Sequence, residues 1–176
     1  MSMVDRTGLR TRAATPADAA AIAAIYNQGI ADLIATFETE PRRTEKIRKW
    51  FKPGNLIVVA ETGVAGPLAF AASFPYSARP CYAGIGEFSV YVAREHRGRG
   101  AGTAVLGALI EAASTARLYK LTSRVFPENV VSRALSKGLG FEEIGTHRRH
   151  GQLDGFWRDC VIVERLLDTS TAGNQP

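Results

Sequence analysis

The chain has 176 residues, 45% of them hydrophobic, and its 22 Lys and Arg outnumber its 17 Asp and Glu, which gives a formal net charge of +5. This composition predicts an ordinary folded protein with a real core and about one domain. The start lacks a signal-peptide core, and no apolar run approaches the roughly 18 residues of a membrane span, so we expect a cytoplasmic protein that contacts no membrane. The two cysteines form no disulfide framework and lack the spacing of a metal site.

In chain order, the pattern predicts a strand, two helices, three strands, a helix, a strand, a helix and two final strands. Thr15 followed by Pro16 marks the start of the first helix. The expected strands are 9–13, 56–60, 67–74, 84–93, 121–126, 141–147 and 156–166, and the expected helices are 15–33, 43–51, 103–116 and 130–137. Hairpins outnumber crossovers in this order, so we expect an α/β (α+β) fold with a mixed, largely antiparallel sheet of six to seven strands. We expect these elements to form one domain over 8–167. The small and polar residues 168–176 are expected to form a flexible tail.

A glycine-rich loop leaves the strand over 84–93 and opens the next helix, with Gly98, Gly100 and Gly102 close together. Backbone N–H groups at a helix start lack intrahelical partners and favour phosphate, and glycines let the backbone approach its oxygens. Thr103 stands where a dinucleotide fingerprint needs Gly, and the chain has no Gly-Lys pair for a Walker A loop. Two alternatives remain, a phosphate site and a tight turn with solvated arginines.

The string Arg97-x-x-Gly100-x-Gly102 at a strand-to-helix junction resembles the acetyl-CoA signature of the GNAT N-acetyltransferases, whose element order matches nearly the whole chain. The resemblance implies acetyl-CoA as cosubstrate, with pyrophosphate held by the amides of residues 98–103. It also implies a GNAT sheet flanked by about four helices and splayed between its fourth and fifth strands, where the thioester enters. The cofactor residues implied are Val90, Tyr91, Val92, Arg97, Gly98, Arg99, Gly100, Ala101, Gly102, Thr103 and Asn129. Asn129 fits a helix cap equally well.

Glu87 lies within the strand that feeds this loop, and alternation places it on the face opposite Phe88 and Val90. A carboxylate there can take the proton that an ammonium group must lose before it attacks an acyl carbon. Taken alone, Glu87 fits a solvated residue or a partner of a nearby arginine. The segment 79–92 resembles phosphinothricin-type acetyltransferases, and the segment 149–159 resembles the arsinothricin N-acetyltransferase branch. This resemblance implies that Glu87 is the general base.

The same resemblance implies a small, glutamate-like and anionic amino acid as substrate: phosphinothricin, arsinothricin or methionine sulfoximine, in detoxification or resistance. Arg79 and Tyr82 occupy family positions suited to such a substrate, and Phe37 is a plausible wall. Family members carry His or Tyr where this chain has Ser136, so no side chain is an obvious general acid. We expect no metal, and a homodimer by resemblance alone.

Two alternatives to this function stay open. One is acetylation of a peptide or protein by the same fold, and the other is a non-catalytic acyl-CoA-binding or nucleic-acid-binding module. Basic residues are spread along the chain, so we expect no nucleic acid partner, and three arginines between 94 and 99 place part of the positive surplus beside the phosphate loop. We expect Trp50 and Trp157 to be packing residues, and the resemblance leaves a dimer contact open for Trp157. We expect His147 and His150 to be solvated residues at a strand end. We expect Arg117, Lys120 and Arg124 to form a solvated edge.

Overall fold

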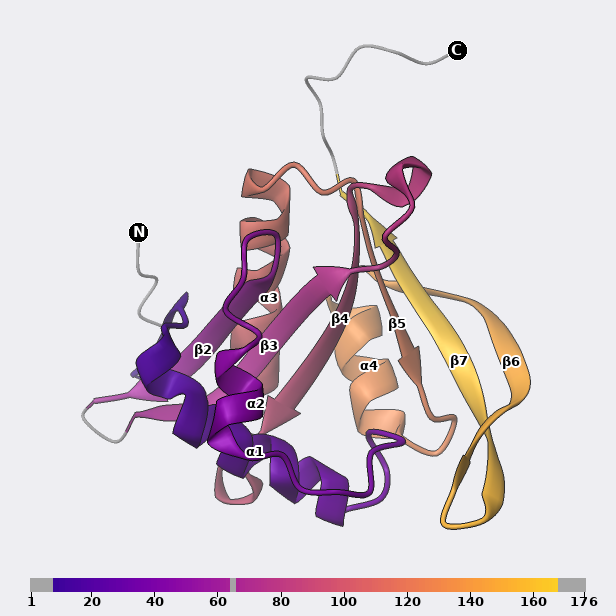
Figure 1. Cartoon of the computed structure of the whole chain (residues 1–176), viewed down its shortest axis with the longest axis horizontal. Helices are drawn as coiled ribbons and strands as arrows, with labels where there is room; N and C mark the ends of the chain where they lie inside the picture. Colours follow the sequence, from indigo (N-terminus) through magenta and orange to yellow (C-terminus); the bar gives the residue numbers. More distant parts are fainter. Residues whose placement is uncertain (1–7, 64–65, 168–176) are drawn as a thin grey trace.

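A computed structural model of the chain describes residues 8–63 and 66–167, and the predicted tail over 168–176 lies outside them. One seven-stranded sheet runs through this part in the order β1-β2-β3-β4-β5-β7-β6 (Figure 1). Its strands are β1 (Leu9–Ala13), β2 (Leu56–Thr62), β3 (Pro67–Pro75), β4 (Ile85–Val92), β5 (Lys120–Val125), β6 (Glu142–Leu153) and β7 (Phe156–Leu166). Among these described strands, the β4–β5 pair alone is parallel, which confirms the predicted mixed, largely antiparallel sheet.

In the described residues four α-helices flank the sheet, as predicted: α1 (Ala19–Ala31), α2 (Thr44–Arg48), α3 (Ala101–Thr115) and α4 (Val130–Gly138). The first predicted helix begins as a 3₁₀ turn over Pro16–Asp18 with a capping box between Thr15 and Asp18, and then continues as α1. The helix α2 is shorter than predicted, because the chain tightens into turns after Arg48, where Trp50 N–H donates to the Ile47 carbonyl at 2.9 Å.

β6 is longer than predicted. Alternation indicated a strand only as far as His147, whereas pairing with β7 continues to Leu153. Between His147 and Gly151 the register shifts, and Arg149 adopts a left-handed φ of 49°. Such a bulge interrupts the alternation of side chains without ending the strand, so the pattern stops before the hydrogen bonding does.

The two faces of the sheet carry different helices. The helix α3 packs on one face over a core that includes Phe88, and α1 and α2 pack on the other (Figure 1). Tyr91 points to the α1 side, where its ring lies 5.3 Å from that of Phe70, and it approaches Gly29 so closely that a Cβ there would lie 2.6 Å from the ring. The predicted alternation of β4 is therefore confirmed.

The sheet opens between β4 and β5. These strands pair at only three positions, of which Glu87 opposite Thr122 is the last before they diverge (Figure 1). The predicted splay between the fourth and fifth strands is therefore confirmed. In the described part of the chain, no helix is long and apolar enough to cross a membrane.

Candidate active site

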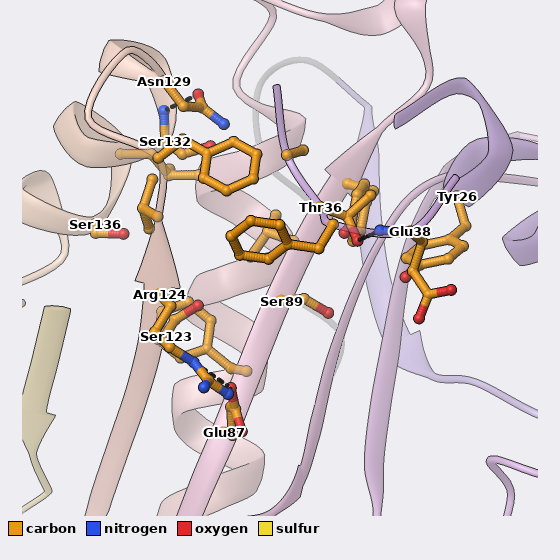
Figure 2. Close-up of a pocket in the computed structure, with 18 of the residues that line it drawn as sticks. Tyr26, Thr36, Glu38, Glu87, Ser89, Ser123, Arg124, Asn129, Ser132 and Ser136 are labelled. Carbon is orange, nitrogen blue, oxygen red and sulfur yellow. Dashed lines mark hydrogen bonds and ion pairs between the residues drawn. The ribbon is translucent and has the colours of Figure 1, made fainter. Parts of the chain in front are cut away.

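A cavity of about 510 Å³ occupies the splay. Its walls are residues 87–91 of β4, residues 123–126 at the end of β5, the inner side of α4, and residues 35–38 of the loop after α1 (Figure 2). Predicted residues Glu87, Val90, Tyr91, Asn129 and Phe37 all line it. The cavity therefore joins segments that lie far apart in the sequence.

The loop after α1 is fastened across the wide end of the splay. Asn129 donates from Nδ2 to the Ile34 carbonyl at 3.2 Å, and its Oδ1 accepts the Ser132 N–H at 3.1 Å as the cap of α4. The Phe37 ring meets Phe126 edge to face, with centroids 4.8 Å apart. The helix-cap role of Asn129 is confirmed, and Phe37 forms a wall of this cavity.

Glu87 faces an arginine across the splay. Oε1 of Glu87 accepts hydrogen bonds from Nε of Arg124 at 3.1 Å and from its Nη2 (Figure 2). Arg124 is exposed, as expected, but it does not lie on an edge, because β5 lies between β4 and β7 and its parallel pairing with β4 brings Arg124 to the site. Alternation in β5 already separated Arg124 from the buried Leu121, but only knowledge of which strand lies next to β5 would have identified the partner.

Two histidines of β6 extend this cluster. Nη1 of Arg124 lies 3.3 Å from Nε2 of His150, whose ring stacks on that of His147 with centroids 4.5 Å apart. Desolvation lowers the pKa of His150 below its usual value, and the nearby His147 and Arg124 lower it further. A neutral His150 can accept the Arg124 hydrogen bond. Both histidines are exposed as expected, but they lie inside β6 rather than at a strand end.

A second cavity, of about 270 Å³, adjoins the first. Glu87, Ser123 and Arg124 line both cavities, so the ion pair stands between them. The second cavity is walled by aromatic and aliphatic side chains with a few charged groups: Tyr76, Tyr82, Ile85, Lys120, Thr122, Ile144, His147, Ile162 and Glu164.

Two of the predicted substrate residues line these cavities, one in each, whereas Arg79 lines neither. Tyr82 lines the second cavity, and the guanidinium carbon of Arg79 lies 5.5 Å from its ring centroid. Both come from the segment around the 3₁₀ turn Pro80–Tyr82, where Arg79 N–H donates to the Ser77 hydroxyl at 3.2 Å. Phe37 lines the first cavity, so the structure brings Arg79 and Tyr82 together and places Phe37 apart from them.

The glycine loop has the backbone that its sequence predicts. Gly98 and Gly100 have φ values of 71° and 83°, and Gly100 is the N-cap residue of the 15-residue α3. A Cβ on either would meet no atom within 4 Å, so conformation rather than space calls for glycine. At Gly102 a Cβ would lie 3.3 Å from Leu135, so space is limited there. The loop therefore presents the first turn of α3 with little side-chain cover.

The arginines of this loop are held by a carboxylate that the sequence did not single out. Asp32, after α1, accepts from Arg94 Nη2 at 2.6 Å and from Arg97 Nη2 at 2.7 Å. Burial alone would raise the pKa of Asp32, but the hydrogen bonds from Arg94 and Arg97 outweigh it and leave the pKa below its usual value. Asp32 therefore offsets part of the local positive surplus, while Arg99 stays exposed.

The remaining predicted residues have plain structural settings. The ring of Tyr91 is buried beside Tyr26, with centroids 4.8 Å apart, so a ligand that follows β4 would meet its backbone. Trp50 packs against Phe74 as predicted, whereas Trp157 is 56% exposed, which corrects its assignment as a packing residue. Within the described residues, no three His, Cys, Asp or Glu side chains are grouped to hold a metal ion.

Comparisons with known proteins point to one family. The sequence model of the acetyltransferase (GNAT) family matches residues 22–141. A phosphinothricin N-acetyltransferase of Streptomyces coelicolor is 32% identical over 149 residues, which cover 81% of this chain and 87% of the relative.

Two solved structures share the fold. A phosphinothricin acetyltransferase from Sinorhizobium meliloti in complex with acetyl-CoA superposes with a TM-score of 0.86 at 26% identity, covering 96% of this chain and 94% of that one. A ribosomal-protein-alanine N-acetyltransferase from Brucella melitensis superposes with a TM-score of 0.84 at 32% identity, covering 89% and 99%.

Proposed function

The chain belongs to the acetyltransferase (GNAT) family, and we propose that it transfers the acetyl group of acetyl-CoA to the amino group of a small, glutamate-like amino acid. Candidate substrates are phosphinothricin, methionine sulfoximine and arsinothricin, whose acetylation would confer resistance. The observation that carries the proposal is the position of Glu87, a carboxylate at the boundary between a long cavity in the splay and a smaller second cavity.

The residues around the splay fit acetyl-CoA. Gly98 and Gly100 expose the first turn of a 15-residue helix, whose unpaired N–H groups suit a pyrophosphate. Beyond Glu87 the main chain of β4 no longer pairs with β5, so its polar groups on that side are available to a pantetheine arm. Bound there, the thioester supplies an activated acyl carbon next to Glu87.

The chemistry then falls to few groups. Glu87 takes one proton from the substrate ammonium, and the freed amine forms a bond to the thioester carbon. A main-chain N–H near Val90 stabilises the negative charge on the carbonyl oxygen. The carbon–sulfur bond breaks, the thiolate takes up the second amine proton through water, and Glu87 returns its proton to solvent. Ser136 lines the cavity and needs no role in this scheme, since a thiolate is a reasonable leaving group.

The second cavity suits the acceptor. Tyr82 and Tyr76, whose rings meet edge to face at 5.7 Å, offer packing surface for an aliphatic chain. Arg79 stands over Tyr82 with a guanidinium that can take a side-chain phosphinate or carboxylate by two parallel hydrogen bonds. Phe37 contributes from the other side of the ion pair as a wall near the reacting atoms.

A second candidate is acetylation of a peptide N-terminus, which the likeness to a ribosomal-protein-alanine N-acetyltransferase favours. The two functions separate in a thiol-release assay with acetyl-CoA. The panel holds L-phosphinothricin, L-methionine sulfoximine, L-arsinothricin, L-glutamate and an alanine-initiated peptide. We expect release with the first three amino acids; release with the peptide alone would overturn the proposed substrate class.

A further inference from the structure

The ion pair of Glu87 and Arg124 divides the two cavities, and both members have unused hydrogen-bonding capacity. Oε1 of Glu87 accepts both bonds from Arg124, while no described residue donates to Oε2. Of the five N–H bonds of a guanidinium, Nε, Nη2 and Nη1 of Arg124 each use one, toward Glu87 and His150, so two remain. The pair thus presents one free anionic oxygen beside two free cationic donors.

This arrangement matches the head of a free amino acid. A free amino acid carries an ammonium group and a carboxylate on the same carbon. The ammonium group can pair with the carboxylate of Glu87 while the carboxylate pairs with the guanidinium of Arg124. We propose that Arg124 binds the α-carboxylate of the acceptor while Glu87 takes its ammonium group, so that acetylation requires a free α-carboxylate. The inference rests on the proposed function and deepens it, because it separates free amino acids from peptides, whose N-terminal residue has an amide in place of the carboxylate.

The surroundings of Arg124 support this role over that of a plain surface ion pair. Its side chain is 45% exposed and that of Glu87 is 34% exposed, so solvent or a ligand can reach both. His150 lies against Nη1 from β6 and orients the guanidinium without adding a competing carboxylate. The other cation of the second cavity, Lys120, is already paired with Glu164 at 3.0 Å.

The two arginines then divide the work. Arg124 lines the second cavity beside Glu87, and Arg79 lies over the ring of Tyr82, which lines the same cavity, without lining it itself. An amino acid with an anionic side chain would meet a guanidinium at each end, and its amine would lie at Glu87, between the cavities. Arg79 selects an anionic side chain, while Arg124 selects a free amino acid over a peptide.

Matched substrates test the proposal. The kcat/KM of the wild-type protein is measured with L-phosphinothricin and with its α-carboxamide, which keeps the amine and the side chain. We expect the free acid to be preferred by a factor on the order of 100, because a site built for a carboxylate is left with unpaired donors by the amide. In Arg124→Gln, kcat/KM for the free acid should fall much further than that for the carboxamide, so that most of the preference for the acid is lost.

Controls separate recognition from structure. Arg133→Gln breaks a comparable ion pair with Glu143, which lines neither cavity, and should leave the preference unchanged. Arg124→Lys keeps the charge without the fork and should recover only part of the preference. An equal loss on both substrates, or a wild type that accepts the carboxamide as well as the acid, overturns the proposal.

Calorimetry with L-phosphinothricin and its carboxamide in the presence of CoA tests the inference without turnover. Suppose that the wild type binds the acid selectively, that Arg124→Gln abolishes this binding, and that no amine is acetylated. That result would overturn the proposed function and uphold this site. Acetyl transfer at the same rate to the acid and to the carboxamide would uphold the proposed function and overturn this site. If L-phosphinothricin and the carboxamide bind equally, the inference is wrong whatever the protein acetylates.

Discussion

The carboxylate of Asp32 accepts a hydrogen bond from Nη2 of Arg97 at 2.7 Å, and so ties the end of α1 to the loop that precedes α3. The same guanidinium donates from Nε to the Val92 carbonyl at 3.1 Å, at the end of β4. Arg97 is therefore a brace within the loop, and Asp32 fixes its orientation. The two residues are 65 positions apart in the sequence, and the fold alone brings them together.

This brace predicts the behaviour of Asp32→Asn. The substitution removes the charge that holds Arg94 and Arg97, so the loop should be less well ordered before the cofactor binds. We expect the KM for acetyl-CoA to rise by roughly threefold to tenfold, in line with one or two lost charge-assisted hydrogen bonds at an exposed site, and kcat to stay within about twofold. Steady-state kinetics at saturating acceptor measure both, and Glu111→Gln, an exposed carboxylate on α3, serves as control. A lower KM would show that releasing the two arginines favours acetyl-CoA binding more than the loss of loop order disfavours it.

Glu87→Gln tests the general base. The amide keeps the size of the side chain and cannot take a proton, so we expect kcat to fall by a factor on the order of 10² to 10⁴, while the Kd for acetyl-CoA stays within about twofold. Glu143→Gln, in the pair with Arg133 outside both cavities, should leave kcat unchanged. Undiminished turnover by Glu87→Gln would assign proton removal to another group.

Gly100→Ala separates the strain of the loop from its function. Gly100 has a φ of 83° and Gly54, in the turn before β2, has a φ of 88°, and a Cβ on either would meet no atom within 4 Å. Both alanine substitutions should therefore lower the free energy of unfolding by about 1 kcal/mol. Only Gly100→Ala should also raise the KM for acetyl-CoA, because the backbone N–H groups around Gly100 form the proposed pyrophosphate site. Equal effects on KM would mean that the loop has no binding role.

The ion pair of Asp18 with Arg12 should make part of the free energy of unfolding depend on pH. Hydrogen bonds from Arg12, at 2.8 and 2.9 Å, chiefly lower the pKa of the buried Asp18 from 3.8 to about 2. Folding thus favours the ionised form, which contributes about 2 kcal/mol. That contribution is complete well above pH 3.8 and is lost as the pH falls through about 2.

Asp18→Asn should accordingly lower the free energy of unfolding by about 2 kcal/mol at pH 7, and the difference from the wild type should shrink between pH 5 and pH 2. Urea unfolding at a series of pH values measures this, with the exposed Glu111→Gln as the control. A difference that does not vary with pH would assign the effect of the substitution to packing or to the capping box.

Local patterns in the sequence determined much of the fold. Alternation in β4 identified which face carries Phe88 and which carries Tyr91, and Thr15 with Pro16 marked the start of the first helix. These features depend on neighbours within a few residues, so they can be read from one segment at a time. Where local rules break, as at the bulge around Arg149, the prediction ended too early.

The sequence by itself also identified the glycine loop, Glu87 on β4 and the family. The glycine motif and the segment around Glu87 are each a contiguous string of residues with fixed spacing, so they can be recognised without the fold. Only the tertiary structure decided which groups face them. Arg124 becomes the partner of Glu87 because β5 lies parallel to β4, and Asp32 becomes the partner of Arg97 because α1 ends beside the loop. Pairings between charges on distant segments leave no local periodicity, and they are set by strand order and helix packing. The net charge of +5 could be counted from the sequence, whereas the positions of the arginines in the braced loop and beside Glu87 depend on the fold.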